Sequence, residues 1–247
     1  MNTADGTSKD TPTADPTPAS LTAIMPVYNE SATLRQVVDR VLALDLGVEL
    51  EVVAVDDGSA DDSVAIIEQL GDPRLRLVRH GANRGKGAAI RSGLAAATGD
   101  IVVIQDADLE YDPAQWRDLL APILAGEVDV VYGSRFLGRA EGMRRRNRLA
   151  NQGLTLLTRL LYGTPITDME TCYKMMRREV VAGIDLEAEK FDIEPEITAR
   201  LLRRGVEIRE VPIRYEARTH DEGKKIGWSD GVQAVTTLLK WRLRRRF

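Results

Sequence analysis

The stretch Ile101-Val-Val-Ile-Gln-Asp-Ala-Asp-Leu-Glu110 joins an apolar run to a pair of carboxylates. Asp106 stands where the run should end as a buried strand, and period-two alternation puts Asp108 on the same side if the extended backbone continues. Two carboxylates so placed can share a Mg²⁺ or Mn²⁺ ion, whose remaining positions bind a diphosphate. A solvated turn is the alternative interpretation of this Asp-x-Asp pair.

On both sides of this stretch, short apolar strands alternate with amphipathic helical segments from Leu21 onward. This alternation predicts an α/β protein, in which helices cover both faces of a mostly parallel central sheet. The predicted strands are Leu21–Pro26, Leu50–Asp56, Leu75–Arg79, Ile101–Asp106 and Asp129–Gly133. The predicted helices between them are Ser31–Leu44, Asp62–Leu70, Gly87–Ala97 and Pro113–Ala125.

Polar residues gather at the ends of the first two predicted strands as well. These are the segments Pro26-Val-Tyr-Asn-Glu30 and Asp56-Asp-Gly-Ser59. Ligands of open parallel sheets lie outside the carboxyl ends of the strands, where carboxylates can accept hydrogen bonds from a nucleobase or ribose and Gly58 permits a close backbone approach. The alternative for the second segment is a tight turn, with Ser59 or Asp61 capping the next helix.

The segment Asn83-Arg-Gly-Lys-Gly87 is a basic, glycine-rich loop before a predicted helix. It lacks the spacing and the terminal Lys-Ser/Thr pair of a P-loop, which argues against an ATPase. A loop of this composition can seat a base or a diphosphate near a helix start.

The alternation breaks after Gly133 into an arginine-rich stretch, which we expect to form a loop. Arg135, Arg139, Arg144, Arg145, Arg146 and Arg148 face only Glu141 there, although the whole chain of 247 residues has a formal charge of -4. An anionic partner is plausible, and a solvated face is the alternative. Nucleic acid fits poorly, since only 5% of residues are aromatic and no binding module is recognisable. Further elements are expected near Leu149–Tyr162 (helix), Cys172–Arg177 (strand), Glu194–Arg204 (helix) and Val206–Tyr215 (strand).

The ends of the chain carry two further expectations. Residues 1–20 are rich in Thr, Pro, Ala and Asp, which predicts a disordered tail before a single domain over residues 21–228. Residues 229–247 read as a basic amphipathic helix, in which Val232, Val235, Leu238 and Leu239 form one apolar stripe and Trp241 suits an anionic lipid interface. A helix packed on the core with a frayed charged end is the alternative.

The lone Cys172 cannot form an internal disulfide, and two histidines cannot complete a zinc site. A reducing cytoplasm fits best. The sequence has no apolar run that approaches the roughly 20 residues needed to span a bilayer, so any membrane contact is expected to be peripheral, on the cytoplasmic face. The sequence leaves the oligomeric state open.

Together, the quoted motifs resemble those of one enzyme family. The strand-end segments, the glycine-rich loop, Gly133-Ser-Arg135 and Asp168-Met-Glu-Thr-Cys-Tyr-Lys174 occur in an order that resembles the inverting GT-A-fold glycosyltransferases of family 2, of the dolichol-phosphate mannose synthase type. The resemblance runs from about Leu21 to Trp241 and implies a Rossmann-like GT-A fold.

The resemblance also implies roles for single residues. The donor nucleotide site would comprise Pro26, Tyr28, Glu30, Asp56, Asp57, Lys86, Asp106, Ala107 and Asp108. The metal ligands would be Asp106, Asp108 and Glu110, although many relatives have Gln at the last position. The acceptor phosphate would meet Arg135, Arg148 and Asn151, and also Arg218 and Lys225 in a mobile loop, Thr219-His-Asp-Glu-Gly-Lys-Lys225. Asp106, Asp108 and Arg135 would be the catalytic group.

The reaction implied is transfer of a hexose, mannose from GDP-mannose, to a polyprenyl phosphate with inversion. Three alternatives remain open. The donor could be UDP-glucose or another UDP-sugar, the acceptor could be soluble, or the protein could bind nucleotide sugars without catalysing transfer. The intact Asp106/Asp108 pair argues against the last.

Overall fold

The computed structural model describes residues 19–217 and 228–244. In this part of the chain a seven-stranded sheet has the order β3-β2-β1-β4-β6-β5-β7. Its first half is parallel and consists of β1 (Ser20–Val27), β2 (Glu49–Asp56), β3 (Leu75–Arg79) and β4 (Ile101–Ile104). All three crossovers between these strands are helical, as the alternating pattern predicts.

The second half of the sheet departs from the parallel order. The strand β6 (Lys174–Arg177) lies between β4 and β5 (Val130–Glu141) and is antiparallel to both. The last strand, β7 (Arg209–Glu216), is parallel to β5. The predicted sheet, mostly parallel with helices on both faces, is therefore confirmed.

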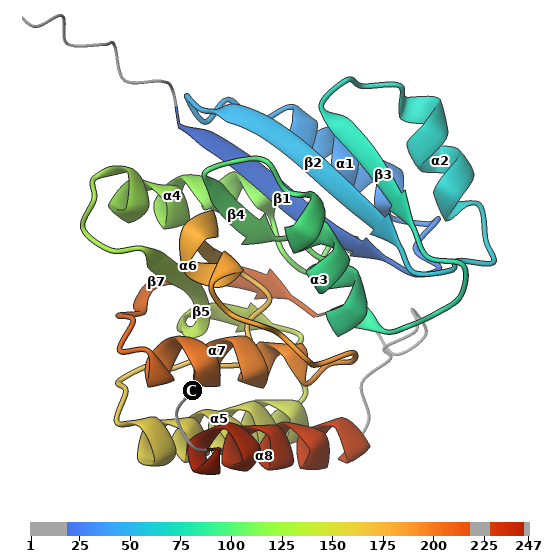
Figure 1. The fold of residues 1–247 in the computed structure, drawn as a ribbon. Coiled ribbons are helices and arrows are strands. Elements are labelled where there is room, and N and C mark those ends of the chain that lie inside the picture. The colour runs from blue at the N-terminus through green and yellow to red at the C-terminus, as the bar shows by residue number, and fades with distance from the viewer. Residues whose placement is uncertain (1–18, 218–227, 245–247) are drawn as a thin grey trace, which may run out of the picture.

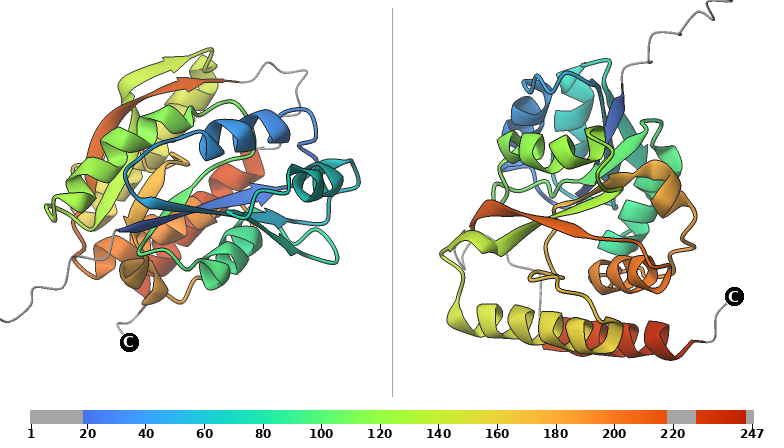
Figure 2. Two further views of the ribbon diagram at one scale, coloured as in Figure 1. Left: turned by 90° about the horizontal axis from the view of Figure 1, so that it is seen from above. Right: turned by 90° about the vertical axis from the view of Figure 1, so that its left-hand side faces the viewer.

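Figure 2 shows the helices in layers on both sides of the sheet. One face is covered by α1 (Leu34–Leu42), α2 (Ser63–Leu70) and α4 (Trp116–Leu124), which follows the short 3-10 helix η1 (Pro113–Gln115). The other face is covered by α3 (Lys86–Ala96) and α7 (Ile193–Arg203), and the short α6 (Arg178–Ala182) follows β6. In Figure 1, α5 (Arg145–Tyr162) and α8 (Trp228–Leu243) lie side by side beyond α7.

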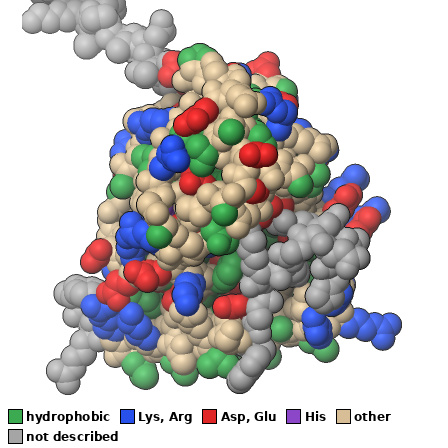
Figure 3. Space-filling model, turned by 90° about the vertical axis from the view of Figure 1, so that its right-hand side faces the viewer, with side chains coloured by type: hydrophobic (Ala, Val, Ile, Leu, Met, Phe, Trp, Pro, Cys, Tyr) green, Lys and Arg blue, Asp and Glu red, His purple; other side chains and the backbone are tan. Residues whose placement is uncertain are grey.

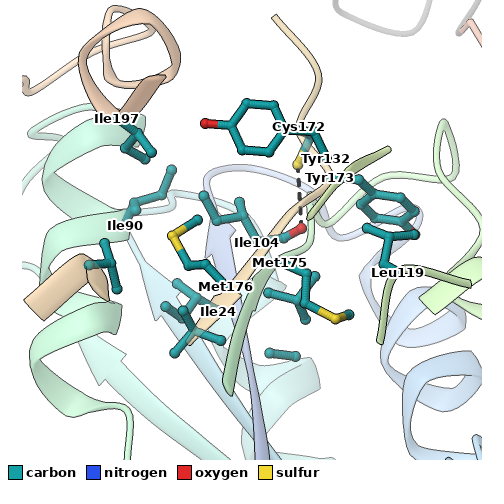
Figure 4. Packing of buried hydrophobic residues seen from close by; sticks show 14 of the residues in the cluster. Ile24, Ile90, Ile104, Leu119, Tyr132, Cys172, Tyr173, Met175, Met176 and Ile197 are labelled. Carbon is teal, nitrogen blue, oxygen red and sulfur yellow. Dashed lines mark hydrogen bonds between the residues drawn. The ribbon is translucent and has the colours of Figure 1, made fainter. Parts of the chain in front are cut away.

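The core holds the sheet between these layers. Ile24 on β1 and Ile104 on β4 are almost fully buried, and Ile90 of α3 and Ile197 of α7 approach from the helical side (Figure 4). Helix α3 packs closely on the sheet because Gly93 has no side chain at the point where it meets Ile24.

Three expectations for the C-terminal half are wrong. The arginine-rich stretch is not a loop, because β5 continues to Glu141 by pairing with β7, and α5 already begins at Arg145. The predicted stripe on the last helix divides between two sides, since Leu238 is fully buried and Leu239 is exposed. Trp241 is 2% exposed, and the guanidinium of Arg200 lies 4.1 Å from its ring centroid, so this ring packs in the protein and not at a lipid interface.

Two predictions fall mainly outside the described residues. The tail is one of them, although β1 already begins at Ser20. The other is the loop with Arg218 and Lys225, together with the last three residues of the basic C-terminus. No described helix is long and apolar enough to cross a membrane.

Candidate active site

A cavity of about 840 Å³ opens at the carboxyl edge of β1, β2 and β4. Its position follows from the topology, because parallel strands deliver their C-terminal residues to one edge of the sheet. Most of the predicted site residues line it: Pro26, Tyr28, Glu30, Asp57, Lys86, Asp106, Ala107, Asp108, Glu110, Arg135 and Asn151. Asp56 and Arg148 are not among its lining residues, and Arg218 and Lys225 lie outside the described part of the chain.

Lys86 lies between the carboxylates of Asp106 and Glu194, which both line the cavity. Its Nζ lies 2.7 Å from Oδ1 of Asp106 and 3.3 Å from Oε1 of Glu194, the second residue of α7. Burial lowers the pKa of Lys86, but the negative charges of Asp106 and Glu194 outweigh it and hold that pKa well above its usual range. The ammonium is therefore a fixed positive charge at the start of α3.

Asp108 and Glu110 are held by the turn that follows β4. Oδ1 of Asp108 accepts a hydrogen bond from the N–H of Glu110 at 3.0 Å, and Oε2 of Glu110 accepts one from the hydroxyl of Tyr215 at 2.8 Å. Asp108 is 5% exposed. The bond from Tyr215 thus engages the carboxylate of Glu110, which the resemblance implies as a third metal ligand.

The described residues contain no ready-made group of three or more His, Cys, Asp or Glu side chains for a metal ion. Two carboxylates in a cavity nonetheless fit Mg²⁺ or Mn²⁺, because Mg²⁺ is usually held by one or two carboxylates together with substrate phosphates. Asp106 and Asp108 supply the hard oxygen ligands that such an ion prefers. The metal assignment remains a prediction.

Asp57 organises the loop between β3 and α3. Its carboxylate accepts hydrogen bonds from the N–H groups of Arg84 (2.9 Å) and Gly85 (2.7 Å) and lies 2.7 Å from Nδ1 of His80. Gly58, at φ +76°, lies so close to this loop that an added Cβ would stand 2.7 Å from the carbonyl carbon of Ala82. The close backbone approach predicted at Gly58 therefore joins two loops of the protein.

Asp56 has a local partner as well. It is 2% exposed, and its Oδ1 accepts the N–H of Ser59 at 3.2 Å. Asn29, which has a positive φ of 54°, connects the first strand-end segment to this turn. Its Oδ1 accepts a hydrogen bond from the N–H of Ala60 at 2.8 Å, and its own N–H donates one to the hydroxyl of Ser59 at 3.0 Å. The turn in the second strand-end segment is thus present, but neither Ser59 nor Asp61 is the N-cap of α2, which is Asp62 and makes no side-chain cap hydrogen bond. The nucleotide-binding role stays a prediction.

Arg135 forms a buried bidentate pair with Asp168. Its Nε and Nη2 each lie 2.7 Å from a carboxylate oxygen, and its guanidinium is 5.3 Å from the ring centroid of Tyr215. Burial lowers the pKa of Arg135, but Tyr111 and Asp168 raise it well above its usual value. Asp168 engages two of the three guanidinium nitrogens, so Nη1 is the nitrogen that this pair leaves for a ligand.

The other predicted acceptor residues come from α5. Asn151 lines the cavity, as do Arg146 and Asn147 of the same helix. Arg148 is exposed, and its guanidinium lies 5.7 Å from the ring centroid of Phe136. Within this stretch the geometry therefore favours Arg146 over Arg148 as the second arginine that a ligand in the cavity would meet.

Sequence reasoning missed the network behind Lys86. Glu194 also lies 2.5 Å from Nζ of the fully buried Lys174, which donates to the backbone carbonyls of Met169 and Thr171. This network fixes the segment 168–174, in which the side chain of Glu170 lines the cavity. Its two contacts to Glu194 join residues 20 and 108 positions apart in the chain, so no local pattern could reveal them.

The comparisons agree with the motifs. A model of glycosyl transferase family 2 matches residues 22–184. The polyprenol monophosphomannose synthase of Mycolicibacterium smegmatis is 30% identical over 98% of this chain and 93% of its own length. The dolichol-phosphate mannosyltransferase of Pyrococcus furiosus is 28% identical over 90% of this chain, which spans 64% of that relative's length.

A solved structure shares the fold. The glucosyl-3-phosphoglycerate synthase of Mycobacterium tuberculosis, in complex with Mn²⁺, UDP and phosphoglyceric acid, superposes with a TM-score of 0.73. It is 23% identical, and the likeness covers 92% of this chain and 80% of that one. The predicted GT-A fold is confirmed by this likeness and by the family match. With the family model covering most of the chain and one relative aligned over nearly its whole length, this protein belongs to glycosyl transferase family 2.

Proposed function

We propose that the protein transfers mannose from GDP-mannose to a polyprenyl phosphate, with inversion at the anomeric carbon. The observation that carries the proposal is that one cavity contains both an acidic pair, Asp106 and Asp108, and a basic side formed by Arg135 and Arg146. Such a cavity can hold two anionic substrates next to each other. The names of the two mannosyltransferase relatives support the choice of sugar and lipid.

The donor half of the site would be formed by the edge of β1, β2 and β4. Asp106 and Asp108 would hold Mg²⁺ or Mn²⁺, which when bound would neutralise charge on the departing diphosphate. The mycobacterial fold neighbour binds Mn²⁺ or Mg²⁺ together with UDP, which supports a divalent ion here. Lys86 stands at the N-terminus of α3, where its positive charge and the helix end both favour a phosphate group.

The acceptor half would be formed by β5 and α5. Arg135 is held in place by Asp168, so it can offer Nη1 to a phosphate without a large loss of side-chain entropy. Arg146 and Asn151 line the same side of the cavity. An acceptor phosphate is already an anion and can attack without a strong general base, so these residues would act by holding it close to the donor.

A lipid acceptor places the reaction at a membrane surface. We propose the cytoplasmic side, because the buried thiol of Cys172 fits a reducing compartment and the donor is a nucleotide sugar. Attachment would be peripheral.

A donor and acceptor panel tests the proposal. Purified protein is incubated with GDP-mannose or UDP-glucose, with polyprenyl phosphate or 3-phosphoglycerate, and with Mg²⁺, Mn²⁺ or chelator. We expect a mannosyl lipid from GDP-mannose and polyprenyl phosphate only, and only with a divalent ion. Transfer from UDP-glucose, or to the soluble acceptor, would overturn the substrate assignment, and binding of donor without transfer to any acceptor would overturn the enzymatic one.

A further inference from the structure

Two neighbouring helices carry most of the large hydrophobic side chains that the described residues expose. Of the eight large hydrophobic side chains that the described residues expose, six lie on α5 and α8. They are Leu149, Leu156 and Leu160 on α5, and Val232, Leu239 and Leu243 on α8. We call these six side chains the α5–α8 outer face.

The spacing of the six residues places each set on one side of its helix. Both sets follow the same steps of seven and then four residues, which return to nearly the same angle on a helix of 3.6 residues per turn. The opposite sides face inward, as the buried Thr158 of α5 and Trp241 of α8 show. Because α5 and α8 lie next to each other in one outer layer (Figure 1), both exposed stripes point away from the body of the protein.

Basic side chains surround this apolar surface. Helix α5 contains no acidic residue, and in α8 only Asp230, which lines the cavity, is acidic. The exposed cations of the two helices include Arg145, Arg148, Arg159 and Arg242. Figure 3 shows hydrophobic side chains along the lower edge of the molecule, where Figure 1 places these helices, with Lys and Arg side chains on either side.

We propose that the α5–α8 outer face lies on an anionic lipid bilayer. Interfacial helices bind membranes in this way. Their leucines enter the boundary between headgroups and acyl chains, and their arginines contact lipid phosphates beside them. A second copy of the chain is a poorer occupant. A symmetric contact through this face would bring its arginines close to those of the partner.

The same two helices connect the membrane to the cavity. Their N-terminal halves line it through Arg146, Ala150 and Asn151 of α5 and through Gly231 and Ala234 of α8. A lipid phosphate could thus enter the cavity while its acyl chain stays in the bilayer. This step rests on the proposed function, whereas the attachment itself rests only on the surface.

Vesicle flotation with matched variants tests the attachment. The full chain is mixed with phosphatidylcholine vesicles with or without phosphatidylglycerol. We expect binding to the anionic vesicles, weakened at high salt, and a loss of at least about tenfold in the triple variant Leu156→Gln, Leu160→Gln and Leu239→Gln. Leu124→Gln on α4 and Leu137→Gln on β5 are controls at exposed leucines outside this face and should bind as the wild type does. Thermal unfolding of all variants checks that the exposed substitutions leave the fold intact.

The remaining outcomes separate the attachment from the proposed function. Transfer to a short-chain, water-soluble polyprenyl phosphate should survive in the triple variant, while transfer to vesicle-embedded polyprenyl phosphate should fall with binding. Two results would overturn the membrane assignment. One is a wild-type protein that does not bind anionic vesicles, and the other is a dimer in sedimentation analysis that the triple substitution abolishes. Vesicle binding by a wild type that transfers no sugar to either lipid would support the attachment and defeat the proposed function alone.

Discussion

Asp57 has, at the residue scale, a structural role beside the nucleotide contact that its sequence position predicts. Its carboxylate is within hydrogen-bond distance of three groups of the loop 80–85. The side chain therefore holds in place a loop on the donor side of the cavity. A substitution there would alter both the fold and the binding of ligands. The two effects can be separated by measurement.

Asp57→Asn should destabilise the protein by about 1–3 kcal/mol, because an amide cannot accept all the hydrogen bonds that the buried carboxylate accepts. Urea unfolding measures this, with Asp62→Asn, an exposed acid of the same segment, as the control. We expect donor affinity in calorimetry to fall together with stability. Weaker donor binding at unchanged stability would instead make Asp57 a direct nucleotide contact.

Glu170 is a buried residue whose ionisation should couple stability to pH. Burial, with an opposing effect from Lys174, raises its pKa from 4.5 to about 7. The folded state therefore keeps a proton that the unfolded chain releases near 4.5. The stabilisation is fully present below that pH and is lost as the pH rises to about 7.

Glu170→Gln should weaken this dependence. The wild type should lose up to a few kcal/mol of unfolding free energy between about pH 4.5 and about pH 7, at about 1.4 kcal/mol per pKa unit, and the variant should lose less. Denaturant unfolding across this range measures the difference, and Glu179→Gln on α6 is an exposed control that should follow the wild type. Parallel profiles for all three proteins would contradict the role of Glu170.

Site residues could be predicted where they follow a strand. Asp106, Asp108 and Tyr28 were found because parallel strands end at one edge, and the cavity is there. Glu194 could not be found in this way. Its partner Lys86 is more than 100 residues earlier in the chain, and only the packing of α7 beside α3 brings the two side chains to 3.3 Å.

Helix α3 depends at the element scale on a glycine at its contact with the sheet. Gly93→Ala would place a methyl group against the Cγ2 of Ile24, and we expect a loss of about 1–3 kcal/mol from overpacking. Gly153→Ala in α5 has open space and should gain about 0.5–1 kcal/mol from helix propensity. Chemical unfolding of both variants tests this contrast. Equal changes of the same sign in the free energy of unfolding would refute it.

Elements of the N-terminal half were predicted closely because their burial pattern is local. The strand Leu75–Arg79 has the predicted bounds, and β2 begins one residue earlier than expected. The end of β5 was missed because Arg139–Glu141 become a strand only by pairing with Arg214–Glu216 of β7. The antiparallel insertion of β6 was equally hidden, since strand direction depends on the path of the chain and not on a strand's own residues.

The cavity and the α5–α8 outer face belong, at the scale of the whole molecule, to opposite sides of one helical layer. The sequence predicted an α/β domain and a basic last helix, but it could not show that α5 lies beside α8. That neighbourhood also decides which side of α8 is buried. The molecule is thus arranged with sheet, cavity, helical layer and exposed apolar surface in succession.

The central claim is that Asp106 and Asp108 form the donor half of a sugar-transfer site, and mannose transfer by Asp108→Asn tests it most directly. Labelled GDP-mannose, short-chain polyprenyl phosphate and Mn²⁺ are used. Asp112→Asn is the control, because the side chain of Asp112 caps η1 and Asn caps equally well. We predict a loss of at least about 100-fold for Asp108→Asn, a folded protein by circular dichroism, and near-normal transfer by the control. Near-normal, Mn²⁺-dependent transfer by Asp108→Asn would contradict the account.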